Sequence, residues 1–122
     1  MSDLYQEILL SELKHPQNHG ELPHFTHSSS GANASCGDQL SVQLLITDAG
    51  VIENIAWRGA GCAISQATMS LLSEHIKGAT TSQVQALTDE TLSELTGITQ
   101  IAITRKKCLM LGLVTLREAL KI

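Results

Sequence analysis

Three cysteines and one aspartate are the side chains of this sequence best suited to chemistry: Cys36, Asp38, Cys62 and Cys108. Three thiolates and a carboxylate are ligands that zinc accepts in a four-coordinate site. A thiolate is also the form of cysteine that attacks electrophiles. The gaps of 2, 24 and 46 residues include no closely spaced cysteine pair, so only the tertiary fold could bring the four together. The spacing alone leaves three interpretations open: a metal site, a reactive sulfur, and buried structural thiols.

Each cysteine falls at a predicted boundary between elements. Cys36 precedes the first strand of a hairpin, Cys62 opens a helix after the second strand, and Cys108 opens the last helix. A cysteine that only fills a core usually lies inside an apolar stripe, whereas the unpaired N–H groups and the dipole at a helix start favour the thiolate. Gly37 and Gly61 lie beside two of these cysteines, and glycine lets a backbone wrap closely round an ion or a sulfur. These positions favour a functional role.

The remaining polar candidates have ordinary structural interpretations. Asp38 follows a glycine, and such pairs form turns, so on its own it indicates no more than a turn. His75 is expected near a helix end, where a surface cation is favoured. The run Arg105–Lys107 is expected in a solvated loop before Cys108. Histidines also gather in one polar segment, where we expect solvated imidazoles and no metal tract: His15, His19, His24 and His27.

The first half of the chain is predicted to contain a helix, a loop and a hairpin. Ser2 and Asp3 are suited to begin a helix, and the His15–Pro16 step ends it because the residue before a proline disfavours helix. Residues 15–35 show little periodicity and predict a long ordered loop or a short edge strand. Alternating apolar residues predict two strands, at 40–46 and 51–57, joined by a turn at 48–50.

Helices are predicted after the hairpin. Apolar residues spaced by three and four follow Gly61 and stop at Lys77–Gly78, where a helix C-terminus is expected. Thr80–Gln83 fits a capping box, and Thr88 is placed to cap a further helix. The last helix is predicted over Cys108–Leu120 and is expected to be buried on more than one side. This order predicts an α+β fold, with a small antiparallel sheet covered on one face by helices.

The composition indicates one folded domain spanning residues 1–122. With eight Lys and Arg, a formal net charge of −4 and 2% aromatic residues, a nucleic-acid partner is not expected. The longest apolar runs fall far short of the roughly 20 residues that cross a bilayer, so no membrane partner is expected. Three cysteines cannot all pair within the chain, and without a secretory signal we expect reduced thiols and a cytoplasmic protein.

Three short motifs and the opening helix resemble a known family. Ser35–Asp38 reads Ser-Cys-Gly-Asp, residues 59–65 read Gly-Ala-Gly-Cys-Ala-Ile-Ser, and Arg105–Cys108 leads into the final helix. The opening LYQEILLSELKHPQNHGEL adds a helix and an Asn/Gly-containing loop. Together these motifs resemble the iron–sulfur scaffold family of IscU, SufU and the N-terminal domain of NifU. The resemblance implies a three-stranded antiparallel sheet and places the family's metal or cluster ligands on Cys36, Asp38, Cys62 and Cys108.

The motif around the third cysteine is closer to SufU than to IscU. IscU-type proteins have a histidine just before this cysteine and an LPPVK-like motif upstream, whereas this chain has Lys107 and the sequence Ile-Ala-Ile-Thr-Arg. Arg105, three residues before Cys108, is similar to an arginine of SufU. The stretch from Cys62 to Cys108 is, however, too short for the insertion usual in SufU.

The resemblance implies three functional hypotheses. A SufU-like protein would hold zinc on the three cysteines and Asp38, and would accept sulfane sulfur from a PLP-dependent cysteine desulfurase at Cys36, its catalytic residue. Arg105 would then steady Asp38 or a ligand sulfur. An IscU-like scaffold, not an enzyme, would assemble a transient 2Fe–2S cluster on Cys36, Cys62 and Cys108, with Cys108 as first sulfur acceptor, for cluster carriers or apo iron–sulfur proteins. The third hypothesis is a non-catalytic interaction domain that zinc stabilises through the same ligands.

Overall fold

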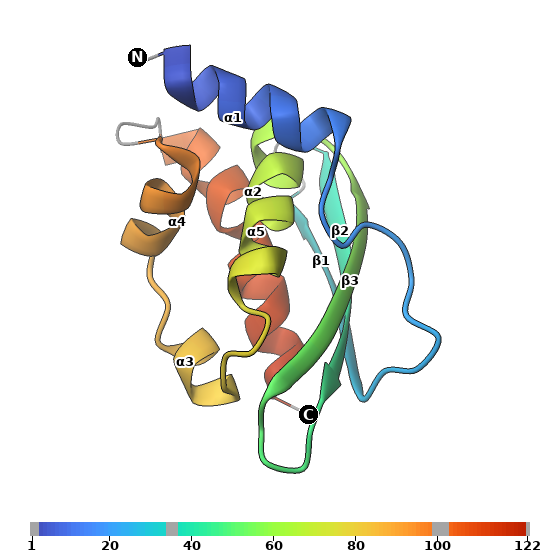
Figure 1. The fold of residues 1–122 in the computed structure, drawn as a ribbon. Helices are drawn as coiled ribbons and strands as arrows, with labels where there is room; N and C mark the ends of the chain where they lie inside the picture. Colours follow the sequence, from blue (N-terminus) through green and yellow to red (C-terminus); the bar gives the residue numbers. More distant parts are fainter. Residues whose placement is uncertain (1–2, 34–36, 99–102, 122) are drawn as a thin grey trace.

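The described part of the chain forms one helix, then three strands, then four further helices. The computed structural model describes residues 3–33, 37–98 and 103–121 (Figure 1). In chain order the elements are α1 (Asp3–Lys14), β1 (His27–Asn33), β2 (Asp38–Ile46), β3 (Ile52–Ala60), α2 (Ala63–His75), α3 (Thr81–Gln85), α4 (Asp89–Thr96) and α5 (Ile103–Leu120). The α+β fold predicted from the sequence is confirmed.

Strand β2 lies at the centre of a three-stranded antiparallel sheet in the order β1-β2-β3. Its side chains alternate: Leu40, Val42 and Leu44 are buried, whereas Gln39 and Ser41 are exposed. This period of two is typical of a strand with one face covered. β1 lies at one edge of this sheet. An edge strand was one of the two structures predicted for residues 15–35, the other being a long ordered loop.

The β2–β3 hairpin is longer than the apolar alternation predicted. β2 already begins at Asp38 and β3 continues to Ala60, so that Gln39 pairs with Ala60. The turn lies where it was predicted, and the Thr47 N–H donates to the Val51 carbonyl at 2.9 Å. The additional pairs bring the start of β2 beside the residues that lead into α2, at the end of the sheet opposite the turn.

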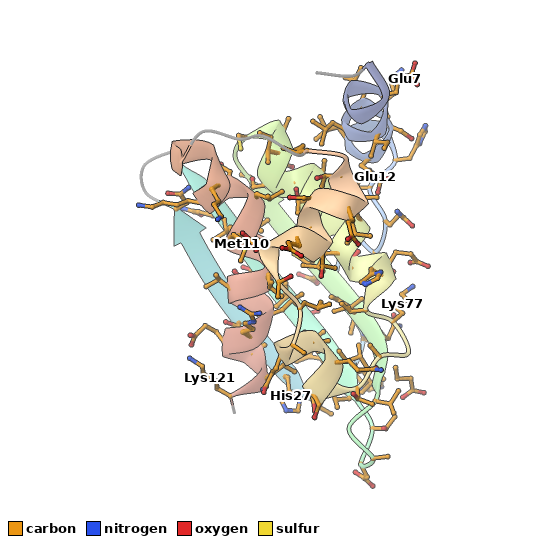
Figure 2. The ribbon with its side chains drawn as sticks, turned by 90° about the vertical axis from the view of Figure 1, so that its left-hand side faces the viewer. Glu7, Glu12, His27, Lys77, Met110 and Lys121 are labelled. Carbon is orange, nitrogen blue, oxygen red and sulfur yellow. The ribbon has the colours of Figure 1, made fainter. Side chains whose placement is uncertain are left out.

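Helices cover one face of the sheet, and α5 and α2 lie side by side in the helical layer (Figures 1 and 2). α5 packs against β1, β2 and α2. Gly112 permits the close approach of α5 to α2, because a Cβ at this position would lie 3.0 Å from the sulfur of Met69. The largest fully buried side chains are almost all aliphatic: Trp57, Leu40, Leu44, Ile52, Ile55, Met69, Leu72, Ile76, Leu92, Leu109, Leu113 and Leu116.

The loop after α1 is held along the outer edge of β3. Trp57 donates its indole N–H to the Gln17 carbonyl at 2.7 Å and its backbone N–H to the Asn18 carbonyl at 3.0 Å. The Gly20 N–H returns a bond to the Trp57 carbonyl at 2.9 Å. Asn18 has a φ of 60°, a conformation that asparagine adopts more readily than most residues. The segment for which a loop or an edge strand was predicted therefore contains both, an ordered loop followed by β1.

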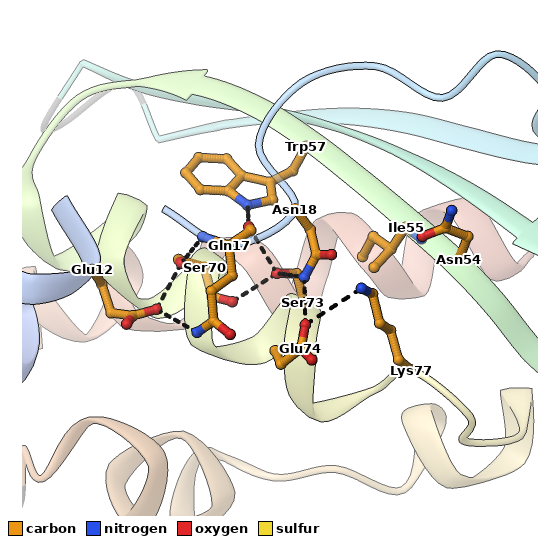
Figure 3. A network of polar contacts seen from close by, with 10 residues as sticks. All are labelled: Glu12, Gln17, Asn18, Asn54, Ile55, Trp57, Ser70, Ser73, Glu74 and Lys77. Atoms are coloured by element: carbon orange, nitrogen blue, oxygen red, sulfur yellow. Dashed lines mark hydrogen bonds and ion pairs between the residues drawn. The ribbon is translucent and has the colours of Figure 1, made fainter. Parts of the chain in front are cut away.

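Buried serines of α2, the helix that follows Cys62, bind this loop and α1 through hydrogen bonds (Figure 3). Ser70 Oγ accepts the Gln17 N–H and donates to Glu12, both at 2.7 Å. Ser73 Oγ accepts from Asn18 Nδ2 at 3.0 Å and donates to the Ser70 carbonyl at 2.6 Å. Buried polar groups are generally satisfied in this way. The network fixes α2 relative to β3.

One helix start and one helix cap differ from their predictions. α5 begins at Ile103 and not at Cys108, because the Lys- and Arg-rich residues before this cysteine are good helix formers and join the helix. α4 begins after Thr88 as predicted. Within the part of the chain that the structure describes, however, the Thr88 side chain accepts no capping hydrogen bond. The capping box of α3 is confirmed: Thr80 Oγ1 accepts the Gln83 N–H at 3.2 Å, and Gln83 Oε1 accepts the Thr80 N–H at 2.9 Å.

The helices differ in how much of their surface is buried. In α1, Ile8 and Leu9 are half-buried and Leu13 is exposed, so the predicted apolar face is buried only in part. α5 buries residues on more than one side, as predicted, including Leu111 as well as Leu113. Among the helices of the described residues, none combines the length and the apolar character needed to cross a membrane.

Candidate metal centre

Three of the four predicted ligands meet at one end of the sheet. The ligand atoms of Asp38, Cys62 and Cys108 all lie within 4.8 Å of one another. They come from the first residue of β2, the residue before α2, and the second turn of α5. Cys36, the fourth predicted ligand, lies outside the described residues. The fold therefore supplies the convergence that the linear spacing could not predict.

Asp38 is buried and held by the backbone of Cys62. It is 1% exposed, and its Oδ1 accepts the Cys62 N–H at 2.7 Å. Its other oxygen, Oδ2, lies 3.7 Å from the Cys62 sulfur. A backbone donor thus fixes one carboxylate oxygen while the other faces a thiol. Because Asp38 belongs to β2, its interpretation as an ordinary turn residue is wrong.

Gly61 leaves the space in which this carboxylate lies. Its φ is +135°, and a Cβ there would lie 2.7 Å from the Asp38 Cα and 2.9 Å from the Asp38 Cγ. Contacts this short would force Asp38 to move. The glycine beside the second cysteine is therefore required for close approach of the backbone to a candidate ligand.

Cys62 is the N-cap residue of α2, as predicted. Its φ and ψ are −73° and 160°, and its side chain is half-buried. The sulfur lies 3.8 Å from Ser65 Oγ, which donates to the Cys62 carbonyl at 3.0 Å. The thiol therefore lies at the start of a helix and remains partly open to an incoming ion or electrophile.

Cys108 lies inside α5 and is fully buried, with an exposure of 0%. The prediction that it gains from the unpaired N–H groups of a helix start is wrong, since α5 begins at Ile103. Asn33 Nδ2, at the end of β1, donates to the Cys108 sulfur at 3.7 Å. Sequence reasoning missed Asn33 because it lies in the segment with little periodicity. Its one sequence signal is its place three residues before Cys36.

The cations before Cys108 lie on a helix and not in the predicted loop. Lys106 Nζ lies 2.9 Å from Asp89 Oδ2, and this hydrogen bond from Lys106 holds the pKa of Asp89 below its usual value. Lys107 is exposed. The side chain of Arg105 lies outside the described residues, so its role at the site stays a prediction. The ion pair connects α4 to α5 at a residue two positions before Cys108.

The predicted loop histidines do not join this group. Three of them are exposed and His27 is half-buried. The ring of His19 lies edge-on to Trp57, with centroids 4.9 Å apart. Within the described ranges, the only close group of three or more potential ligands is the one formed by the aspartate and the two cysteines. His75, exposed at the last residue of α2, lies where it was predicted.

The donor set and its spacing fit a single metal ion. Zinc bonds of about 2.3 Å to sulfur and 2.0–2.2 Å to oxygen put neighbouring ligands of a tetrahedral ion roughly 3.3–3.8 Å apart. The described ligand atoms all lie within 4.8 Å of one another, and the 3.7 Å between Asp38 Oδ2 and the Cys62 sulfur already falls in this range. They provide three ligands, and a tetrahedral ion takes a fourth.

The sequence matches a family model along almost its whole length. The model of the NifU-like N terminal domain matches residues 4–122. The chain belongs to this family. The resemblance to IscU, SufU and NifU proteins, from which the ligand set was predicted, is thereby confirmed.

Relatives of this NifU-like domain include IscU and SufU proteins. The iron–sulfur cluster assembly scaffold protein IscU of Thermotoga maritima is 32% identical in an alignment of 133 positions, which covers 97% of this chain and 93% of the relative. The zinc-dependent sulfurtransferase SufU of Bacillus subtilis is 30% identical over 78 positions, which cover 64% of this chain and 52% of the relative. The identities alone do not separate the two branches.

Solved structures share the fold of this NifU-like domain. A proposed iron–sulfur cluster assembly scaffold protein for the SUF system, from Fervidobacterium islandicum AW-1, has a TM-score of 0.78 at 24% identity, covering 98% of this chain and 99% of its own. The N-terminal part of a nitrogen-fixing NifU-like protein from Brucella abortus has a TM-score of 0.79 at 18% identity, covering 98% and 93%. These likenesses support the three-stranded sheet with helices on one face.

Proposed function

We propose that this NifU-like domain is a SufU-like iron–sulfur cluster assembly protein, which accepts sulfane sulfur from a PLP-dependent cysteine desulfurase at a zinc site. The observation that carries the proposal is the convergence of Asp38, Cys62 and Cys108 within 4.8 Å. Two thiols and a carboxylate at these separations are a suitable donor set for zinc. The Bacillus subtilis relative is named a zinc-dependent sulfurtransferase, which agrees with this chemistry.

Cys36 supplies the fourth ligand in this proposal. Only Gly37 separates it from Asp38, so the Cα atoms of the two ligands are at most about 7 Å apart. Gly37 has a φ of +70°, a conformation that glycine adopts without strain. When bound, zinc would keep the thiols of its ligands deprotonated at neutral pH.

The proposed chemical step moves one sulfur atom between two cysteines. The Cys36 thiolate attacks the outer sulfur of the persulfide on the desulfurase. An S–S bond forms on Cys36 as the S–S bond on the desulfurase breaks, and the desulfurase cysteine leaves as a thiolate. The proton of the persulfide stays on the transferred sulfur, so the step needs no outside oxidant or reductant.

Burial distinguishes the candidate sulfur acceptors. Cys108 is 0% exposed, whereas Cys62 is partly exposed. An acceptor must reach a persulfide carried by another protein, which a fully buried sulfur cannot do without movement of its surroundings. This argues against Cys108 as the first acceptor, the role that an IscU-like mechanism gives it. Of the other two cysteines we assign the role to Cys36, because the Cys-Gly-Asp motif resembles that of the sulfur acceptor in SufU.

An IscU-like scaffold is the second candidate function. The Thermotoga maritima IscU aligns with 97% of this chain, and the stretch from Cys62 to Cys108 is short for a SufU. In this case the cargo would be a transient 2Fe–2S cluster on Cys36 and the two described cysteines, passed to cluster carriers or apo iron–sulfur proteins. We favour the SufU-like function because Lys107 replaces the histidine that IscU-type proteins have before the third cysteine.

The test is sulfur uptake by Cys36→Ala. Anaerobic protein is incubated with a SufS- or IscS-like desulfurase and sulfur-labelled cysteine, and protein-bound label is counted. We expect uptake by the wild type and by Ser30→Ala, an exposed control on β1, and none by Cys36→Ala. Undiminished uptake by Cys36→Ala would overturn the proposal. If the domain does not change the turnover of the desulfurase, and if it unfolds when its metal is chelated, it is instead a zinc-stabilised interaction domain.

A further inference from the structure

Asn33 on β1 and Asp38 on β2 lie opposite each other at the candidate metal centre. They are paired residues of β1 and β2. Both are buried, with exposures of 8% and 1%. The Asp38 side chain contacts Cys62, the residue before α2. The Asn33 side chain contacts Cys108 on α5. Each of these strand ends therefore has a polar contact to one candidate ligand.

The two contacts differ in kind. Asp38 accepts the backbone N–H of Cys62, so it holds the chain beside that sulfur. Asn33 donates a side-chain N–H to the Cys108 sulfur itself, at 3.7 Å. A donor of this kind interacts more strongly with a charged acceptor than with a neutral one. The low dielectric around two buried groups strengthens the interaction further.

We propose that Asn33 is a positioning residue that holds the Cys108 sulfur as the retained ligand of the site, so that incoming sulfur is accepted by another cysteine. This inference rests on the proposed function. The donated N–H directs the sulfur of Cys108 and draws electron density from it, which makes it a poorer nucleophile. Cys62 is half-buried, so an incoming reagent reaches it more easily.

The test separates the donor from the shape of the side chain. Asn33→Leu removes the N–H donor and keeps the number of heavy atoms and the branching of the side chain. Asn54→Leu makes the same change at an exposed position of β3 that pairs with Leu45, near the turn end of the sheet. Cys108→Ser and the double variant complete a cycle that isolates the coupling between Asn33 and the sulfur.

Two readouts follow the Cys108 sulfur without any desulfurase. Cobalt(II) titrations give metal affinity and the sulfur-to-cobalt absorption band, and peptide mass spectrometry gives the alkylation rate of each cysteine in metal-free protein. We expect Asn33→Leu to lower cobalt affinity about 10- to 100-fold, as removal of a ligand's outer partner does. Cys108 should also be alkylated several-fold faster relative to Cys62. Asn54→Leu should change neither quantity.

Wild-type affinity and alkylation rates in Asn33→Leu would overturn the inference. So would a loss of affinity on Asn33→Leu that is equally large in the Cys108→Ser background. Absence of sulfur uptake in the wild type as well as in every variant would count against the proposed function and not against this contact. Should Asn33→Leu not fold, the side-chain amide protons of Asn33 are compared by NMR in the wild type and Cys108→Ser. We expect them to shift, and unchanged shifts would overturn the inference.

Discussion

The backbone N–H of Cys62 donates a 2.7 Å hydrogen bond to Oδ1 of Asp38. This bond joins the residue before α2 to the first residue of β2, two candidate ligands that are 24 residues apart in the sequence. It satisfies an N–H group at a helix start, where no intrahelical partner exists. Part of the geometry of the candidate metal centre is therefore built into the backbone.

Substitutions of Asp38 separate its two roles. Asp38→Ala removes the acceptor of the Cys62 N–H, and an unpaired buried donor costs about 1–3 kcal/mol. Asp38→Asn keeps an oxygen that accepts this bond but loses the anionic ligand. We expect both variants to bind zinc more weakly, and only Asp38→Ala to unfold at clearly lower urea concentration. Chelator competition and urea titrations of metal-free protein measure the two effects. Equal unfolding midpoints for the two variants would contradict this separation.

Gly61→Ala tests the close approach of the backbone to Asp38. A Cβ at this position would lie 2.9 Å from the Asp38 Cγ, on a backbone with φ of +135°. We expect the free energy of unfolding to fall by roughly 1–3 kcal/mol and zinc affinity to fall as Asp38 is displaced. Gly78→Ala is the matched control, since its φ is +82° and nothing lies within 4 Å of its Cβ. It should lose stability through backbone strain and keep wild-type zinc affinity. The same zinc affinity in both variants would count against the role of Gly61.

Ser70→Ala tests the network that fixes α2 (Figure 3). Ser70 is fully buried, and its hydroxyl accepts the Gln17 N–H and donates to Glu12. Alanine leaves the Gln17 N–H unpaired, which costs about 1–3 kcal/mol. The urea midpoint should fall in Ser70→Ala and stay unchanged in Ser82→Ala, an exposed serine of α3. Equal midpoints would show that the network does not contribute to stability.

The ion pair between Asp89 and Lys106 predicts an acid-dependent contribution to stability. The hydrogen bond from Lys106 lowers the pKa of Asp89 from its usual 3.8, so the unfolded state binds this proton at higher pH than the folded state. The contribution of the ion pair to the free energy of unfolding is present at pH values above the usual pKa. It is lost as the pH falls through the lowered pKa of the folded state. Lys106→Ala should raise the pKa of Asp89 in an NMR titration, whereas Lys107→Ala should not. An unchanged pKa in Lys106→Ala would contradict the assignment.

Local periodicity was sufficient to predict most elements of the fold. The alternation of Leu40, Val42 and Leu44 predicted β2, and the capping box of Thr80 and Gln83 predicted α3, because these signals depend on neighbours within a few residues. The same holds for Cys62, whose place at a helix start followed from the glycines before it and the apolar spacing after it.

Apart from the ligand group, which the family motifs predicted, contacts between distant segments were not predicted. Ser70 and Ser73 are polar residues of α2, yet they are buried because the loop after α1 packs on them. The contact from Asn33 to Cys108 joins residues 75 apart in the sequence, and no local pattern indicates it. The earlier start of α5 was missed because the cations before Cys108 suggested a loop, although Lys and Arg form helices well.

A native mass spectrum tests the central claim most directly. Anaerobically prepared domain is incubated with cysteine and its desulfurase, and one spectrum then reports bound metal and added sulfur together. We expect one zinc ion retained per chain, with one or more added sulfur atoms that peptide analysis locates on Cys36. Zinc that is lost on adding ferrous iron, with iron and sulfide gained in its place and no sulfur on Cys36, would contradict the proposed zinc-dependent sulfur acceptor.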